Sequence, residues 1–495
     1  MILIHNAHFY LGQGFSNEVK AITVEDGKIA ALFSELPDDL KNYECLDLGG
    51  NWVYPGFIDT HTHSFEGGLY SMMVDLSEAT SILDVLELLA SGKDKAKKHL
   101  FAWNFDENKI LEKRFPTRAE LDRVVPDKNL ILRRGDGHSC IINSFACRSL
   151  ANAGRAPRCK SEIFKSVDND QTVHWFHNNL DSESILSAYH AAAQKAMEGG
   201  FCTIHTMVGD ANESITHYAL IKKHLKDYPI DFILYPQSFN IEAALEVGAD
   251  RIGGCILADG SVGSYTAAMY EAYLGIPVRG NLYQSDSFWR SFITRAHRYN
   301  MQVAVHCIGD RAITQINNVY MELANSDFRD LRHQIIHCEV TDDVLINHIK
   351  ASSAVPVMQP AFDYYWGGDN GFYAKALGLE RSRIMNRFAA MLHKGIRVTG
   401  SSDWYVTPLD INFSLDALIN HHNPKEQLLP HQAIDIYTKN AAWLSGDEKL
   451  RGSIEVGLDA DFSVLNYALD QAAETSDRKV SAIIKRGKLV WEAAH

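Results

Sequence analysis

Short apolar runs alternate with longer stretches of helical character through most of this 495-residue chain. Strands that alternate with helices form parallel βα units, and eight such units close a (β/α)8 barrel. The sequence therefore predicts an α/β fold built on a TIM-like barrel. The eight predicted barrel strands are residues 53–59, 201–206, 231–236, 254–259, 301–306, 333–337, 354–359 and 396–401.

The interval between the first two predicted strands is too long for an ordinary βα connection. It covers residues 66–200 and contains strand-like pieces at 100–103 and 130–133 among helical stretches. We predict an inserted α+β subdomain here. Because it follows the first strand, it would overhang the active-site face of the barrel as a lid or a pocket wall.

Both ends of the chain are rich in β-strand patterns, unlike its middle. Residues 1–34 give short alternating strands with an Asp-Gly hairpin signal, and residues 452–491 continue in the same style. Chain ends often lie close together. We therefore predict a small β-sandwich domain of residues 1–54 and 449–495 beside a barrel domain of residues 55–448.

Charge and composition narrow the class of partner. With 48 basic and 62 acidic residues the net charge is -14, which leaves no electrostatic footprint for nucleic acid or an anionic membrane. A small-molecule substrate is expected instead. The chain opens without a basic segment or cleavage site and has no apolar run of about 18 residues, so we expect it in the cytoplasm. Its 8 cysteines form no CxxC pair, which argues against a disulfide framework or a zinc ribbon.

Two histidines close the first predicted strand. His61 and His63 are two residues apart, so on a strand their imidazoles point to the same face and can reach one cation. The spacing alone is weak, since a chain with 22 histidines contains roughly one such pair by chance. Later predicted strands end in His306, His337 and Asp403, which the barrel topology brings to the same face. Together they favour a metal site over separately satisfied side chains.

Several motifs then point to one known family. They are Pro-Gly-Phe-Ile-Asp-Thr-His-Thr-His at 55–63, Ala-Asp-Gly-Ser-Val-Gly-Ser at 258–264, His-Cys-Ile-Gly-Asp-Arg-Ala at 306–312, His337, and Gly-Ser-Ser-Asp at 400–403. With them the chain resembles, over nearly its whole length, the amidohydrolase superfamily in the branch called amidohydrolase family 3. The resemblance implies a distorted (β/α)8 barrel beside a β-sandwich made from both chain ends. It also implies a set of metal ligands: His61, His63, His306, His337 and Asp403.

The fourth predicted strand departs from the family pattern. Many relatives carry a carboxylated lysine there that bridges two metal ions, whereas this chain has Cys255, five residues before Gly260. A carbamate cannot form on cysteine. The Cys255 thiolate could ligate and bridge two ions, or Cys255 could be an inert core thiol beside a single ion. Sulfur ligands favour zinc over manganese or magnesium, so we expect one or two Zn2+ ions, and two if Cys255 bridges.

Four further side chains are candidates for binding substrate. Tyr265 stands where relatives often have an arginine that could grip a substrate anion. His138 could hydrogen-bond a carbonyl oxygen or oxyanion, or be a structural loop residue. Arg134 could bind a carboxylate, or be solvated at the surface. Trp366 could line an aromatic pocket, or serve packing or an oligomer contact such as a homodimer.

The predicted chemistry is hydrolysis of a carbon-nitrogen bond, amide-type and outside peptides. A metal ion activates water and polarises a carbonyl, and Asp403 is the best general base and proton shuttle. Asp403 could alternatively cap the helix after strand eight. The same metal site could hydrolyse an ester or lactone or catalyse an isomerisation, and with structural metals the chain would be a binding or regulatory protein. The complete ligand set favours the enzyme.

Overall fold

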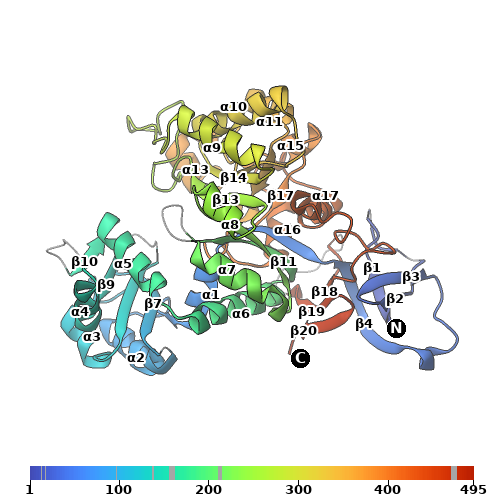
Figure 1. The fold of residues 1–495 in the computed structure, drawn as a ribbon, viewed down its shortest axis with the longest axis horizontal. Coiled ribbons are helices and arrows are strands. Elements are labelled where there is room, and N and C mark those ends of the chain that lie inside the picture. Colours follow the sequence, from blue (N-terminus) through green and yellow to red (C-terminus); the bar gives the residue numbers. More distant parts are fainter. Residues whose placement is uncertain are drawn as a thin grey trace. The chain divides into compact units, whose positions relative to one another are not determined.

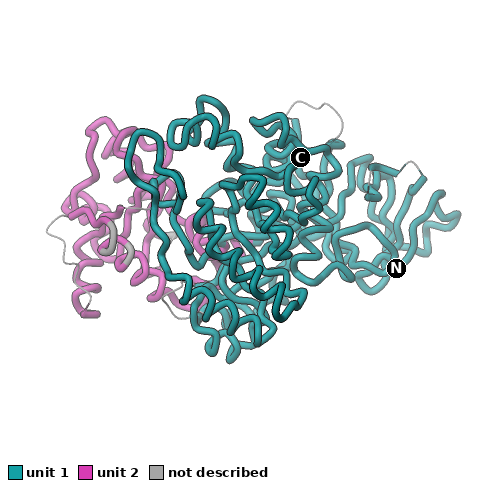
Figure 2. Tube along the Cα trace, turned by 90° about the horizontal axis from the view of Figure 1, so that it is seen from above, with its two compact units in different colours: residues 1–63, 193–495 teal, residues 64–192 magenta. Residues whose placement is uncertain are grey.

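The computed structural model (Figure 1) describes residues 1–12, 14–16, 18–95, 97–135, 139–154, 162–209, 215–469 and 477–494. The chain divides into two compact units (Figure 2). Unit 1 comprises Met1–His63 and Ala193–His495, and unit 2 comprises Ser64–Ala192. Unit 2 covers most of the stretch in which the sequence predicts an insertion. Among the described helices, none combines the length and the apolar character needed to cross a bilayer.

Eight parallel strands form the centre of unit 1. They lie in two hydrogen-bonded sheets, ordered β12-β11-β5 and β13-β14-β15-β16-β17. Each overlaps one of the eight predicted runs, because strands buried on both faces read as continuous apolar segments. The strands are β5 (Phe57–Thr62), β11 (Phe201–Val208), β12 (Asp231–Pro236), β13 (Arg251–Leu257), β14 (Gln302–Cys307), β15 (Gln334–His337), β16 (Val355–Met358) and β17 (Thr399–Gly400).

Side-chain and backbone bonds join the eighth strand to the first. The Thr60 hydroxyl donates to the carbonyl oxygen of Gly400 at 2.9 Å. Beyond β17, the Asp403 N–H donates to the carbonyl oxygen of His61 at 3.0 Å. The two ends of the parallel array therefore contact each other where the candidate ligands lie.

Helices connect and cover these strands. Several begin with a side-chain cap, as where the Ser285 hydroxyl accepts from the Phe288 N–H at the start of α9. The helices of unit 1 are α7 (Thr216–His224), α8 (Ile241–Glu246), α9 (Asp286–Arg298), α10 (Asp310–Ser326), α11 (Asp343–Ser352), α12 (Pro360–Trp366), α13 (Phe372–Leu377), α14 (Leu379–Ser382), α15 (Phe388–His393), α16 (Ile411–Ile419), α17 (Pro430–Tyr437) and α18 (Lys439–Ser445), with the 3-10 turns η1 (Leu40–Asn42) and η3 (Leu225–Asp227).

The two chain ends share one seven-stranded sheet, ordered β20-β19-β18-β4-β1-β2-β3. In Figure 1 the blue N-terminal and red C-terminal strands lie side by side, because β18 pairs antiparallel with β4. Buried side chains from both ends, such as Ile4, Val53 and Phe462, form one core. The strands are β1 (Ile2–Phe9), β2 (Ala21–Glu25), β3 (Lys28–Phe33), β4 (Glu44–Pro55), β18 (Phe462–Leu465), β19 (Val480–Lys485) and β20 (Lys488–Glu492).

The predicted strand 53–59 is in fact the junction of two strands. Residues up to Pro55 belong to β4 of the terminal sheet, and the parallel array begins at Phe57. Gly56 makes the transition, and a Cβ atom there would lie 2.8 Å from Cys202 Sγ. Because both sheets bury this segment, its apolar character is continuous and does not reveal the boundary.

Unit 2 has its own five-stranded sheet, ordered β10-β9-β8-β7-β6. Capping boxes start two of its helices, Ser81 with Asp84 and Thr117 with Glu120. Its elements are α1 (Ser64–Met72), β6 (Val74–Asp75), α2 (Ile82–Gly92), η2 (Lys93–Lys95), β7 (His99–Phe105), α3 (Arg118–Val124), β8 (Asn129–Arg134), β9 (Ser139–Ile142), α4 (Ser144–Asn152), β10 (Ile163–Lys165) and α5 (Ser166–Asn178), and α6 (Ser182–Glu198) runs on into unit 1.

Candidate metal centre

The structure brings the six predicted ligands together. His61 lies directly before Thr62, at which β5 ends, and His63 follows the strand. One ring nitrogen of each histidine and Cys255 Sγ of β13 lie within 4.8 Å of one another. The His337 ring of β15 lies 5.7 Å from the His61 ring and 4.5 Å from the His306 ring of β14, measured between centroids. These side chains come from the C-terminal ends of four different strands, which is where barrel active sites form.

Asp403 completes this cluster after β17. Its Oδ1 lies 3.2 Å from Nε2 of both His61 and His63. Burial opposes ionisation of this carboxyl group, but its contacts with these two imidazoles outweigh burial and lower its pKa. Helix α16 is capped by Asp410 instead, so Asp403 is not the cap that the sequence also allowed.

A bulge in β13 directs Cys255 into the cluster. The pairing of β13 with β14 shifts register between Gly253 and Ile256, and Gly253 and Gly254 have φ values of 99° and 95°. A Cβ atom at either glycine would collide with Ala304 or Met207. Bulges next to active sites commonly re-aim a side chain, and here the residue after the two glycines is the thiol.

The surroundings of Cys255 favour the thiolate. Burial raises the pKa of this thiol, but contacts with His306 and His337, and then with His61 and His63, lower it well below its usual value. In turn, burial lowers the pKa of His306, and the contact with Cys255 outweighs this and raises it to about 9. Thiolate is the form of cysteine that binds metal ions.

Hydrogen bonds fix the orientation of two candidate ligands. His337 Nδ1 lies 2.7 Å from Oε1 of Gln359, so the ring donates from Nδ1 and leaves Nε2 as a lone-pair donor. The Gln359 amide then donates to the Ser401 hydroxyl at 2.9 Å. His306 Nε2 donates to the carbonyl oxygen of Gly260 at 3.1 Å, which leaves Nδ1 for a ligand. Gln359 was not predicted as a site residue.

Two buried aspartates brace the backbone around the ligands. Asp59 accepts from the N–H groups of His61 at 3.0 Å and Ser402 at 2.9 Å, and so holds the first and eighth strands in register. Asp259 accepts from the N–H groups of Ile308 at 3.0 Å and Gly309 at 2.8 Å, just after His306. Burial raises the pKa of Asp59 to about 7 and that of Asp259 to about 6. Neither role was predicted from the sequence. The available signal was an aspartate within an apolar run.

The donor set fits a divalent metal ion. Within the described part of the chain, both ring nitrogens of His61, Nδ1 of His306 and Oδ1 of Asp403 are buried and make no hydrogen bond of good geometry, although His61 Nε2 and Asp403 Oδ1 lie 3.2 Å apart. Buried polar atoms are costly when they are left unsatisfied. Imidazole nitrogen, thiolate sulfur and carboxylate oxygen are the donors that zinc takes in proteins.

A cavity of about 470 Å³ opens onto the cluster. Five of the candidate ligands line it, together with Trp366, which the sequence predicted to bind substrate. Tyr265 is not among the described residues that line it, and its ring packs on Tyr273 and Phe372. The remaining lining residues are Ser261, Val262, Gly263, Ile308, Glu339, Phe362, Phe372, Tyr373 and Val406.

The other two predicted site residues belong to unit 2. His138 lies outside the described residues. Arg134 ends β8, and its Nε forms an ion pair with Glu107 Oε2 at 2.8 Å. The guanidinium is therefore already partnered by a carboxylate of its own unit.

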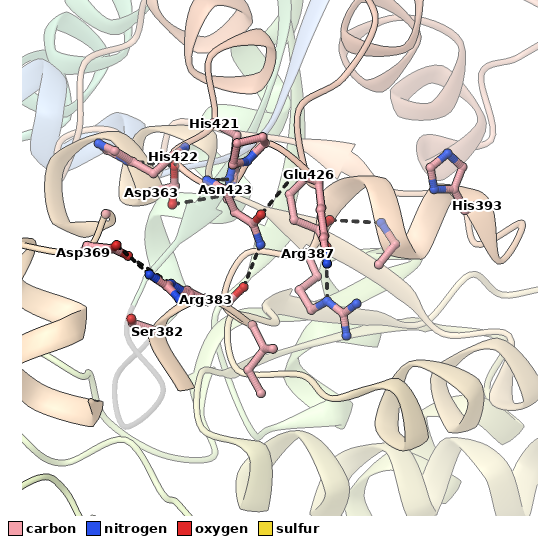
Figure 3. Close-up of a pocket in the computed structure, with 15 residues that line it drawn as sticks. Asp363, Asp369, Ser382, Arg383, Arg387, His393, His421, His422, Asn423 and Glu426 are labelled. Carbon is pink, nitrogen blue, oxygen red and sulfur yellow. Dashed lines mark hydrogen bonds and ion pairs between the residues drawn. The ribbon is translucent and has the colours of Figure 1, made fainter. Parts of the chain in front are cut away.

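A second pocket in unit 1 is larger, about 760 Å³, but none of the candidate ligands lines it. Its polar side chains pair with one another, as Figure 3 shows for Arg383 with Asp369. Asp363 of α12 accepts from the N–H of His422 at 2.9 Å and lies 3.0 Å from its Nδ1 (Figure 3). The smaller cavity at the cluster is thus the candidate active site.

Comparison with known proteins agrees with this assignment of fold. The chain is 25% identical to the YtcJ protein of Bacillus subtilis over 99% of each chain. It is 23% identical to the N-substituted formamide deformylase of Arthrobacter pascens, covering 94% of this chain and 93% of that protein. A solved structure of an uncharacterized metal-dependent hydrolase from Pyrococcus furiosus matches with a TM-score of 0.81 at 21% identity, covering 95% of this chain and 99% of that one. The model of the Amidohydrolase family matches residues 44–491, nearly the whole sequence, and the chain therefore belongs to the amidohydrolase family.

Proposed function

We propose that this amidohydrolase is a zinc-dependent hydrolase of a carbon-nitrogen bond in a small amide outside peptides. The observation that supports this most directly is the convergence of nitrogen, sulfur and oxygen donors on one buried cluster that borders a cavity. The proposed ligands are His61, His63, Cys255, His306, His337 and Asp403. One or two ions are proposed, and two if Cys255 bridges them.

Asp403 is proposed to move the proton. A bound zinc ion lowers the pKa of water toward about 7 and polarises a substrate carbonyl. Asp403 accepts a proton from the attacking water while the water oxygen bonds to the carbonyl carbon. It then delivers that proton to the nitrogen as the carbon-nitrogen bond breaks, so that the products are an acid and an amine. Trp366, which lines the cavity, is proposed to contact the substrate. The roles predicted for His138, Arg134 and Tyr265 stay predictions.

The two parallel sheets are proposed to close as a distorted (β/α)8 barrel over residues 55–448, with the insertion 66–200 after its first strand. The terminal strands of residues 1–54 and 449–495 are proposed to form a β-sandwich. The proposed compartment is the cytoplasm, and a homodimer is the proposed alternative to a monomer.

Two measurements test the proposed function. The purified protein is assayed against N-acyl amines, N-acyl amino acids, formamides, lactams and esters, and amide cleavage that chelator abolishes and zinc restores is expected. Turnover of esters alone, or of no compound in the panel, would contradict it. Bound metal is then counted in the wild type and in Cys255→Ser: a fall from about two zinc ions to about one supports a bridging thiolate, and one ion in both proteins excludes it.

A further inference from the structure

We propose that the substrate amide carries an aromatic or branched apolar group beside the scissile bond and no carboxylate. This names the substrate class of the same site, and so rests on the proposed function. The cavity supports it in three ways: a row of aromatic rings that starts at a candidate ligand, further apolar side chains around that row, and no lysine or arginine among the described residues of its lining.

The aromatic row begins at the candidate metal centre. The Phe362 ring stacks on the imidazole of His337, with centroids 5.7 Å apart and planes 13° apart. Trp366 meets Phe362 edge-on at 4.7 Å, and Tyr373 meets Trp366 edge-on at 6.2 Å. A planar apolar group bonded close to the reacting carbonyl would therefore lie along these rings, in the arrangements that aromatic pairs prefer.

Contacts on the side of helix α12 that faces away from the cavity hold this aromatic row in place. Phe362 and Trp366 line the cavity, while Asp363, the residue after Phe362, is 5% exposed and lines the second pocket (Figure 3). Its carboxylate accepts from the backbone N–H of His422 at 2.9 Å. The wall is thus preformed, and a preformed wall spares the substrate the cost of ordering it.

Three further lining side chains are also apolar. Val262 and Ile308 are buried at 2% and 3% exposure, and Val406 is 50% exposed. Val262 and Ile308 belong to a core cluster that also contains Tyr373. An apolar substituent would leave water and contact these side chains. This burial of apolar surface is the main source of affinity in sites of this kind.

No lysine or arginine in the described lining would form an ion pair with an acidic substituent. The polar side chains beyond the ligands are Ser261, Glu339, Tyr373 and Trp366. The Tyr373 hydroxyl donates to Glu339 at 2.6 Å. The one arginine that the sequence offered for a carboxylate, Arg134, is paired with Glu107. A substrate carboxylate in this cavity would lose its hydration without gaining a partner, which is costly.

Three matched amides test the inference. N-acetylbenzylamine carries the aromatic group alone, N-acetylphenylglycine adds a carboxylate to the same carbon, and N-methylacetamide lacks the ring. We expect kcat/KM for N-acetylbenzylamine to exceed that for each of the other two by about 10-fold or more. Equal or better cleavage of N-acetylphenylglycine or N-methylacetamide would overturn the inference and leave the proposed function standing.

If the proposed function is wrong, none of the three amides is cleaved. The preference for an apolar group over a carboxylate is then tested by calorimetry, as binding of the same compounds to the zinc-loaded protein. Tighter binding of N-acetylbenzylamine than of N-acetylphenylglycine supports it, and equal or reversed affinities overturn it.

Variants of two lining residues, Trp366 and Val406, test whether the cavity wall causes the substrate preference. Trp366→Ala is expected to lower kcat/KM for N-acetylbenzylamine about 10-fold and to affect N-methylacetamide less. The matched control is Tyr364→Ala on the same helix, because Tyr364 is 51% exposed and packs on Phe413 outside the cavity. Val406→Lys places a cation at a half-exposed wall position and is expected to raise kcat/KM for N-acetylphenylglycine relative to N-acetylbenzylamine. An unchanged substrate ratio in both Trp366→Ala and Val406→Lys would contradict the proposed wall.

Discussion

Asp403 is the side chain on which the proposed chemistry depends most. Its Oδ1 lies 3.2 Å from Nε2 of both His61 and His63, close enough to share a metal ion with them. Asparagine keeps the shape and one ligating oxygen, but it cannot carry the proton. We therefore expect Asp403→Asn to lower kcat by about 100-fold or more, while bound zinc, measured by atomic spectroscopy, largely remains. Unchanged kcat in a folded variant would rule out Asp403 as the base.

The candidate ligands and the residues that brace them differ in how far sequence reveals them. A histidine at the end of a predicted parallel strand has a place in the fold as soon as the strands are assigned, so His306 and His337 could be predicted. Gln359 and Asp59 act through bonds to distant parts of the chain. Asp59, for example, accepts from the Ser402 N–H 343 residues away. Such partners depend on how strands meet in three dimensions, and no local pattern encodes them.

At the scale of elements, the strands could be predicted and the irregularities within them could not. Burial on both faces gives each parallel strand a continuous apolar run, but the same run hides where β4 becomes β5 at Gly56. Likewise the alternation of side chains along β13 does not place Cys255, because the register shift after Gly253 changes which face the next residue occupies.

The bulge in β13 makes a prediction about Gly254. Alanine there would have to adopt φ near 95° and would press its Cβ into Met207, so we expect Gly254→Ala to destabilise the chain by about 3 kcal/mol or more and to lower zinc content by displacing Cys255. Gly457→Ala is the control: Gly457 has φ of 93° but open space around its Cβ position, so only the backbone cost of about 1 kcal/mol applies. Equal losses of unfolding free energy in urea would show that packing at Gly254 is unimportant.

At the scale of the molecule, buried charges join the terminal sheet to the parallel strands. Lys485 of β19 lies 2.7 Å from Asp231 of β12 and 2.5 Å from Asp461, and the Lys485 side chain is 6% exposed. Removing the ammonium leaves the buried Asp461 and the partly exposed Asp231 with Arg451 as a remaining partner. We therefore expect Lys485→Met to lower the free energy of unfolding by about 3 kcal/mol. Lys488→Met at an exposed position of β20 is the matched control. If both variants unfold at the same urea concentration as the wild type, the network does not hold the two sheets together.

Two hydrogen-bonded histidines behind the parallel strands, His333 and His297, predict how stability depends on pH. The Val303 N–H donates to Nδ1 of His333, and Nε2 of His333 lies 2.9 Å from Nδ1 of His297. The ring of His297 reaches the carbonyl oxygen of Asp327 at 2.8 Å through its Nε2. Both ring nitrogens of His333 thus have a partner, and burial, with His297 nearby, lowers the pKa of His333 from 6.5 to about 3.

Acid is expected to destabilise the folded chain through His333. Between pH 6.5 and about 3 the unfolded chain binds a proton at His333 that the folded chain does not, so acid favours unfolding. This group is expected to remove about 1.4 kcal/mol of stability for each pH unit below 6.5, and none above it. His333→Gln, which can still accept from the Val303 N–H, is expected to flatten this part of the pH profile in urea unfolding between pH 6.5 and 4. A variant profile as steep as that of the wild type would mean that other buried groups carry the acid sensitivity.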